Sequence, residues 1–146
     1  MPPREAKPAE VPGVIQDAFP NYHGVAWYWR EFVAPSGPDA ACRHLLRFLA
    51  VDYLAEVWLN GVRIGGHEGG ETPFVLDVSH AIKPAQTNRL AVRVLNPTYE
   101  SVDGYALRET PAAYKMSPIQ SNSVYNSGGI VDSVELLVTP VVRIED

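Results

Sequence analysis

Apolar and polar residues alternate along most of the chain with the period of two that is typical of β-strands. Aromatic and β-branched residues crowd the segment 25–33, which predicts a first strand. The run 43–51 carries apolar side chains on both of its faces, and this predicts a central strand. Shorter alternating segments follow at 55–59, 62–64, 74–78, 89–94 and 134–138, with 141–144 as a candidate for a last strand.

Turn residues divide these segments. Asn60-Gly61 joins 55–59 to 62–64 and predicts a tight hairpin, because both turn positions must accept a positive φ. Only 79–85 has a helical pattern, and Pro84 limits it to about one turn. Seven or eight short strands separated by Gly, Pro and Asn turns predict an all-β fold of the β-sandwich type.

Two segments interrupt the strand pattern. The stretch 65–70 contains four glycines, but neither a lysine nor a helix start follows it, so a phosphate site is not expected there. The second interruption is a connection of about thirty residues between Asn96-Pro97 and Gly128-Gly129. It holds four tyrosines, and aromatic residues predict an ordered loop because disordered segments contain few of them.

Composition narrows the classes of function. The 146 residues predict one β-sandwich domain over 21–146, preceded by a partly irregular extension over 1–20.

The net charge of −5 offers no basic patch for nucleic acid, and no apolar run has the length of about 20 residues that a membrane helix needs. One cysteine excludes an internal disulfide and a cysteine-rich zinc site. The four histidines show no ligand spacing, so we expect no metal and no cofactor.

Several motifs in a fixed order resemble the sugar-binding domain of family 2 glycoside hydrolases, and the likeness extends from about Asn21 to Asp146. The resemblance implies a jelly-roll β-sandwich of the galactose-binding-like kind. It also implies a module that lacks the catalytic barrel on which the family carries its two catalytic glutamates. The motifs are Tyr28-Trp29-Arg30, the run 51–61, His67-Glu68-Gly69-Gly70, Thr72-Pro73-Phe74, Asp77-Val78-Ser79, the run 88–94, Gly128-Gly129-Ile130 and Val134-Glu135-Leu136.

This sequence departs from β-galactosidase-type members in two places. One is the long connection, and the other is Val131-Asp132, where those members commonly carry an aromatic residue and an arginine. Jelly-roll modules often hold a structural calcium ion, but no cluster of aspartates identifies such a site here. The implied partners are a carbohydrate and the other domains of a parent glycosidase. For a glycan-binding module we expect a secreted or periplasmic location, although residues 1–8 lack the apolar stretch of a signal peptide.

Sugar recognition needs an aromatic ring against the C–H face of a pyranose and planar polar groups for its hydroxyls. The long connection supplies both kinds of group in one segment. An alternative is that the connection only packs over the sandwich, and that its tyrosines form a private core, which means a small hydrophobic cluster of the loop's own residues. Asn21 is added because the resemblance places an Asn-x-x-Gly of β-galactosidases near the active-site sugar. The candidate ligand-binding residues are Tyr105, Arg108, Glu109, Tyr114, Lys115 and Asn21.

Other aromatic and acidic residues are given structural roles. Trp27, Trp29 and Trp58 sit inside strand patterns, so we expect core packing or contact with a neighbouring domain. His67 and Glu68 belong to a motif that is structural in the resembling family. Three functions therefore stay open: a non-catalytic carbohydrate-binding module, a domain that braces a catalytic barrel without sugar affinity of its own, and an enzyme. The last has the least support, since no paired carboxylates or nucleophile constellation are evident.

Overall fold

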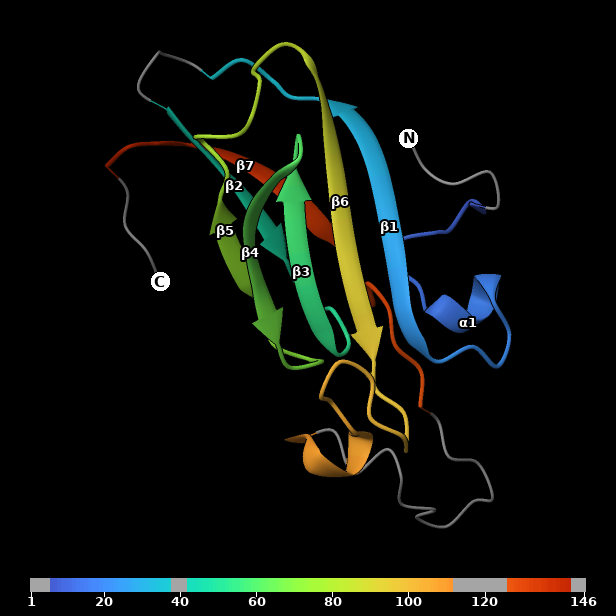
Figure 1. Ribbon diagram of the computed structural model, residues 1–146. Helices are drawn as coiled ribbons and strands as arrows, with labels where there is room; N and C mark the ends of the chain where they lie inside the picture. Colours follow the sequence, from blue (N-terminus) through green and yellow to red (C-terminus); the bar gives the residue numbers. More distant parts are fainter. Residues whose placement is uncertain (1–5, 38–41, 112–125, 143–146) are drawn as a thin grey trace.

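The computed structural model describes residues 6–37, 42–111 and 126–142. In this part of the chain, seven strands form two antiparallel sheets that face one another (Figure 1). One sheet has the order β1-β6-β3-β4 and the other has the order β5-β2-β7. The strands are β1 (Gly24–Val33), β2 (Cys42–Phe48), β3 (Leu54–Leu59), β4 (Val62–Glu68), β5 (Phe74–Asp77), β6 (Thr87–Asn96) and β7 (Val134–Pro140).

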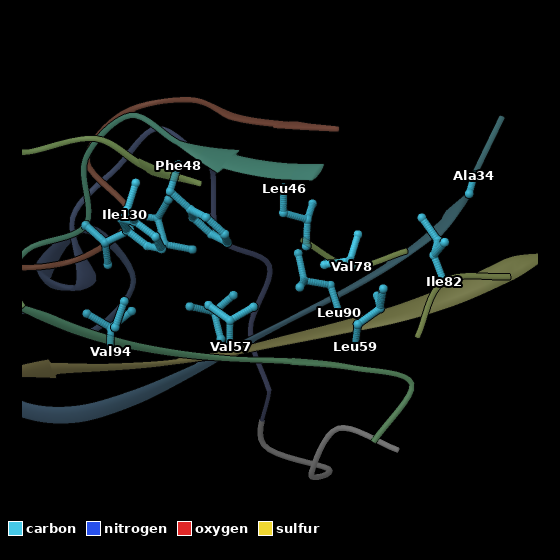
Figure 2. Close-up of a cluster of buried hydrophobic side chains, with 14 of the residues drawn as sticks. Ala34, Leu46, Phe48, Val57, Leu59, Val78, Ile82, Leu90, Val94 and Ile130 are labelled. Atoms are coloured by element: carbon cyan, nitrogen blue, oxygen red, sulfur yellow. The ribbon is translucent and has the colours of Figure 1, made fainter. Parts of the chain in front are cut away.

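The core lies between the two sheets (Figure 2). Val57 and Val94 reach it from the four-stranded sheet, and Leu46 and Phe48 reach it from the three-stranded sheet. The ring of Phe48 stacks on Phe74 with centroids 4.8 Å apart. Burial of one face of each sheet against the other explains the period of two in the sequence. The predicted all-β jelly-roll sandwich is confirmed.

The predicted hairpin joins β3 to β4. Asn60 and Gly61 have φ of 53° and 85°, as a two-residue turn of this kind requires. The Asn60 amide also donates hydrogen bonds of 2.8 Å to Ala81 O and to Oδ1 of the buried Asn88. The segment predicted as central, β2, indeed lies between β5 and β7.

Three local features differ from the sequence prediction. The segment 79–85 forms turns in which the N–H groups of Ala81 and Ile82 both donate to Val78 O, without continuing into a helix. A helical turn, α1 (Ile15–Ala18), lies instead in the N-terminal extension, where Ile15 enters the core. Residues 141–142 form an exposed bend after β7, so they do not start another strand, and 143–144 lie outside the described residues.

The helical segments whose bounds are described are α1 and the 3₁₀ turn η1 (Leu107–Glu109). No helix among the described residues is long and apolar enough to cross a membrane.

Candidate functional site

The connection that follows β6 contains a tight two-residue turn. Val102 and Tyr105 exchange backbone hydrogen bonds of 2.9 Å in both directions. Asp103 and Gly104 between them have φ of 51° and 87°, and positive values at both positions are what such a turn needs. The local sequence Asp-Gly therefore sets the direction in which the chain delivers Tyr105.

Two contacts hold this turn on the outward face of the four-stranded sheet. Leu107 is fully buried and packs with Tyr53, while Tyr105 is half-buried against the same pair. Arg93 of β6 forms ion pairs with Asp103 of the turn and with Glu56 of β3. The tyrosines of the connection were predicted either to bind sugar or to form a private core, and Tyr105 takes part in packing while keeping an exposed side.

A hollow of about 290 Å³ lies beside the Tyr105 ring, over the outward face of β3 and β4. We call it the loop-end hollow. Gly66 lies opposite Glu56 on β4, and a Cβ at Gly66 would lie only 2.5 Å from Ala55 O, so the strand admits no side chain there. The hollow is lined by Leu54, Ala55, Glu56, Arg63, Gly66, His67, Glu68 and Tyr105.

Its two carboxylates are held in fixed positions. Glu56 accepts hydrogen bonds from Arg93 at 3.1 Å and from Arg63 at 3.2 Å. Oε1 of Glu68 accepts the Tyr53 hydroxyl at 2.6 Å. Burial of Tyr53, together with its hydrogen bond to the Glu68 carboxylate, raises the pKa of this phenol. Tyr53 therefore stays protonated and serves as a hydrogen-bond donor that orients Glu68.

The contacts of His67 are of the kind expected for a residue with a structural role. Its ring stacks on Phe74 with centroids 4.6 Å apart, and its Nε2 lies 2.7 Å from Oγ1 of Thr72 in the following turn. Both contacts hold the imidazole against β5 and the turn before it.

Arg108, Glu109 and Asn21 do not line this hollow. Arg108 and Glu109 occupy η1, are exposed, and pair with each other at 3.3 Å. Asn21 has a φ of 63° and lies just before β1, at the end of the sheet where β6 leads into the long connection, because Gly24 pairs with Asn96. Tyr114 and Lys115 lie outside the described residues.

A second, larger hollow of about 590 Å³ was not anticipated from the sequence. We call it the tryptophan groove. Trp27, Trp29 and Trp58 line it, and the first two side chains remain 43% and 38% exposed. The expectation for these residues was core packing or contact with a neighbouring domain. Core packing is wrong for Trp27 and Trp29, because the inward positions of β1 belong to the residues that alternate with them. Contact with a neighbouring domain stays a prediction. The alternation was visible in the sequence, but which of its two apolar faces lies inward was not.

Among the described residues, no group of three or more His, Cys, Asp or Glu side chains is arranged to hold a metal ion.

Comparison with known proteins places the chain in a family. The family model described as "Glycosyl hydrolases family 2, sugar binding domain" matches residues 8–140. The chain belongs to this family. The family that the sequence motifs indicated is thus confirmed.

Similar curated proteins are β-glucuronidases. That of Rattus norvegicus is 30% identical over 154 residues, which cover 95% of this chain and 23% of the relative. That of Mus musculus is 31% identical and covers 100% of this chain and 25% of the relative. The chain therefore spans about a quarter of the length of these relatives.

Similar solved structures share the fold. Faecalibacterium prausnitzii β-glucuronidase gives a TM-score of 0.75 at 30% identity, covering 100% of this chain and 28% of the other. Bifidobacterium dentium β-glucuronidase, complexed with coumarin-3-O-glucuronide, gives a TM-score of 0.71 at 31% identity, covering 96% of this chain and 26% of the other. The chain thus shares its fold with one part of each of these two enzymes.

Proposed function

We propose that this chain is a non-catalytic carbohydrate-binding module that holds a sugar in the loop-end hollow. The observation that carries the proposal is the position of Tyr105, whose half-exposed ring stands beside Arg63, Glu56 and Glu68 in one hollow. An aromatic face together with planar hydrogen-bonding groups is the combination that pyranose recognition needs.

Each group has a definite part in this proposal. The Tyr105 ring packs against the C–H face of the sugar. The guanidinium of Arg63 keeps donors available beyond its one contact with Glu56, because it carries five N–H groups. Oε2 of Glu68 accepts a sugar hydroxyl, since Tyr53 engages only Oε1.

Additional contacts come from the other predicted ligand residues. These are Arg108 and Glu109 on η1, Asn21 before β1, and Tyr114 and Lys115 further along the sequence of the connection. The similar proteins are named β-glucuronidases, so a terminal β-glucuronic acid residue is the first sugar to test. In a longer protein, the module would also contact the other domains of a glycosidase.

The pairings of the carboxylates support binding without hydrolysis. Glycoside hydrolysis uses two carboxyl groups in separate roles, one as an acid and the other as a base or nucleophile. In the loop-end hollow, Glu56 is engaged by two arginines and Glu68 by the Tyr53 hydroxyl. These pairings favour a positioning role for both carboxylates.

The second candidate is a domain that braces a catalytic barrel and has no sugar affinity of its own. The observation that favours it is the match to only 23% to 28% of the similar β-glucuronidases, in which this domain is one part of a longer chain.

A glycan array separates the candidates. The chain is applied to immobilised oligosaccharides that include β-glucuronic acid termini, and sugars that bind are then incubated with it and analysed by mass spectrometry. A carbohydrate-binding module retains sugars and releases no product. A bracing domain retains none. Release of product that is lost in Glu68→Gln identifies an enzyme.

A further inference from the structure

All three tryptophans of the chain line the tryptophan groove. Trp27 and Trp58 have ring centroids 5.1 Å apart, and Trp27 and Trp29 have centroids 6.2 Å apart with planes inclined by 15°. Such clusters are normally buried in a monomeric domain, because indoles bring a large apolar surface. Here two of the three side chains stay more than a third exposed.

Strand register explains why a hollow forms at this place. Trp29 of β1 and Trp58 of β3 are both paired with Ala91 of the intervening strand β6. A methyl group between two indoles leaves a depression in the sheet surface. The hollow is therefore built into regular strands, which makes its geometry rigid compared with that of a loop site.

Polar groups on the rim are fixed in place. Arg89 forms an ion pair with Glu31 at 2.7 Å, and its N–H donates to Oδ1 of Asn60 at 3.0 Å. The backbone of Lys83 is held by Asn88, whose Oδ1 accepts the Lys83 N–H at 2.8 Å. Donors and acceptors thus border the apolar floor.

We propose that the tryptophan groove is a second carbohydrate site, which binds extended β-linked oligosaccharides of equatorially substituted pyranoses. Sugars of this class have broad C–H faces that stack on indoles and hydroxyls at their edges for the rim residues. The volume of about 590 Å³ falls within the range of roughly 300–1,000 Å³ found for small-molecule sites and is twice that of the loop-end hollow.

The two hollows are separate, because no residue lines both. A protein surface could also cover an apolar floor with a polar rim, so a second copy of the chain is one outcome that the test must separate from a sugar.

Intrinsic fluorescence tests the proposal, because every tryptophan of the chain lies in this groove. Cellotetraose and xylotetraose are titrated into the chain while tryptophan emission and its quenching by acrylamide are recorded. We expect at least one of the two probes to produce a saturable change in emission and protection from acrylamide. Trp29→Ala should weaken this binding about tenfold or more, and Trp29→Phe, which keeps a ring, should weaken it less.

Matched variants separate this site from the loop-end hollow. Tyr99→Ala removes an exposed aromatic outside both hollows, and Tyr105→Ala removes the ring of the loop-end hollow. Both should leave the tryptophan signal of the tetraoses unchanged. If Tyr105→Ala abolishes binding and Trp29→Ala does not, the loop-end proposal stands and this one is overturned.

Other results also overturn it. One is the absence of a saturable change for both probes up to about 10 mM, a concentration ten times a dissociation constant of 1 mM. Another is a dimer in sedimentation that Trp29→Ala converts to monomer, because the occupant is then a second copy.

Discussion

The hydroxyl of Tyr53, a residue only 1% exposed, donates a 2.6 Å hydrogen bond to Oε1 of the exposed Glu68. This bond links the small cluster under the long connection to the carboxylate of the loop-end hollow. Tyr53→Phe keeps the ring and removes the donor. We expect the free energy of unfolding to fall by about 1 kcal/mol in urea titrations, since water can solvate the exposed partner.

Burial of Tyr53, together with this hydrogen bond, makes the stability of the chain depend on pH in the alkaline range. Because the pKa of Tyr53 is raised in the folded state, its contribution is complete below pH 10 and is lost as the pH rises toward the folded pKa. Stability of the parent should therefore decline above pH 10 more steeply than that of Tyr53→Phe. Equal slopes for the two proteins would contradict this role.

Asn60 has two tasks in the hairpin. It accepts a φ of 53°, and its side chain bonds Ala81 O, Asn88 Oδ1 and Arg89 N. Asn60→Gly keeps the backbone freedom and loses the bonds, so it should cost about 2 kcal/mol. Asn60→Ala should cost about 1 kcal/mol more in the same unfolding assay, because alanine is strained at positive φ. Equal losses would show that the turn conformation carries no penalty.

Gly128 brings the end of the long connection against the sandwich. A Cβ there would lie 2.6 Å from Asp52 O and 2.7 Å from the Asn96 side chain. Gly128→Ala should therefore cost more than about 2 kcal/mol, because backbone must move to admit the methyl group.

Gly104→Ala is the matched control for this substitution. Gly104 has a φ of 87° but no neighbour within 4 Å of the added Cβ, so only the backbone penalty of about 1–2 kcal/mol applies. Thermal and urea unfolding of both variants would rank them. A larger loss for Gly104→Ala would contradict the close approach at Gly128.

Asp77 should contribute to the decrease in the free energy of unfolding at low pH. Hydrogen bonds from Ser79, with help from the Arg43 guanidinium, lower the pKa of Asp77 to about 2 against the opposing effect of burial. Because the folded pKa lies below the ordinary 3.8, the stabilisation is complete above pH 4 and is lost as the pH falls from about 4 to 2. The difference in unfolding free energy between the parent and Asp77→Asn should shrink over that window.

Glu10→Gln, at an exposed position outside the strands, is the control for Asp77→Asn. It should follow the parent curve. A difference between parent and Asp77→Asn that stays constant from pH 6 to 2 would show that the carboxylate contributes no net stability through its charge.

The sandwich was predictable because its signals are local. Alternation located the strands, Asn60-Gly61 located the hairpin, and apolar residues on both faces of 43–51 marked a central strand. The helical turn at Ile15–Ala18 was missed because four residues are too few for a period to show.

The candidate site was only partly predictable. The sequence indicated the long connection and Tyr105, but it could not show that Arg63 and Glu68 of β4 would stand beside that ring, since their meeting depends on strand register. The sequence also could not show that Trp27 and Trp29 would be exposed. Both faces of β1 carry large apolar residues, so the pattern did not tell which face the other sheet would cover.

Isothermal titration calorimetry with an oligosaccharide ending in β-glucuronic acid tests the central claim, which is sugar binding at Tyr105. The parent should bind with a measurable heat, and Tyr105→Ala should weaken the affinity about tenfold, as loss of a stacked ring implies. Tyr99→Ala, a tyrosine of the same connection outside the loop-end hollow, should bind like the parent. Equal affinity of Tyr105→Ala and parent, or no heat from the parent, would contradict the account.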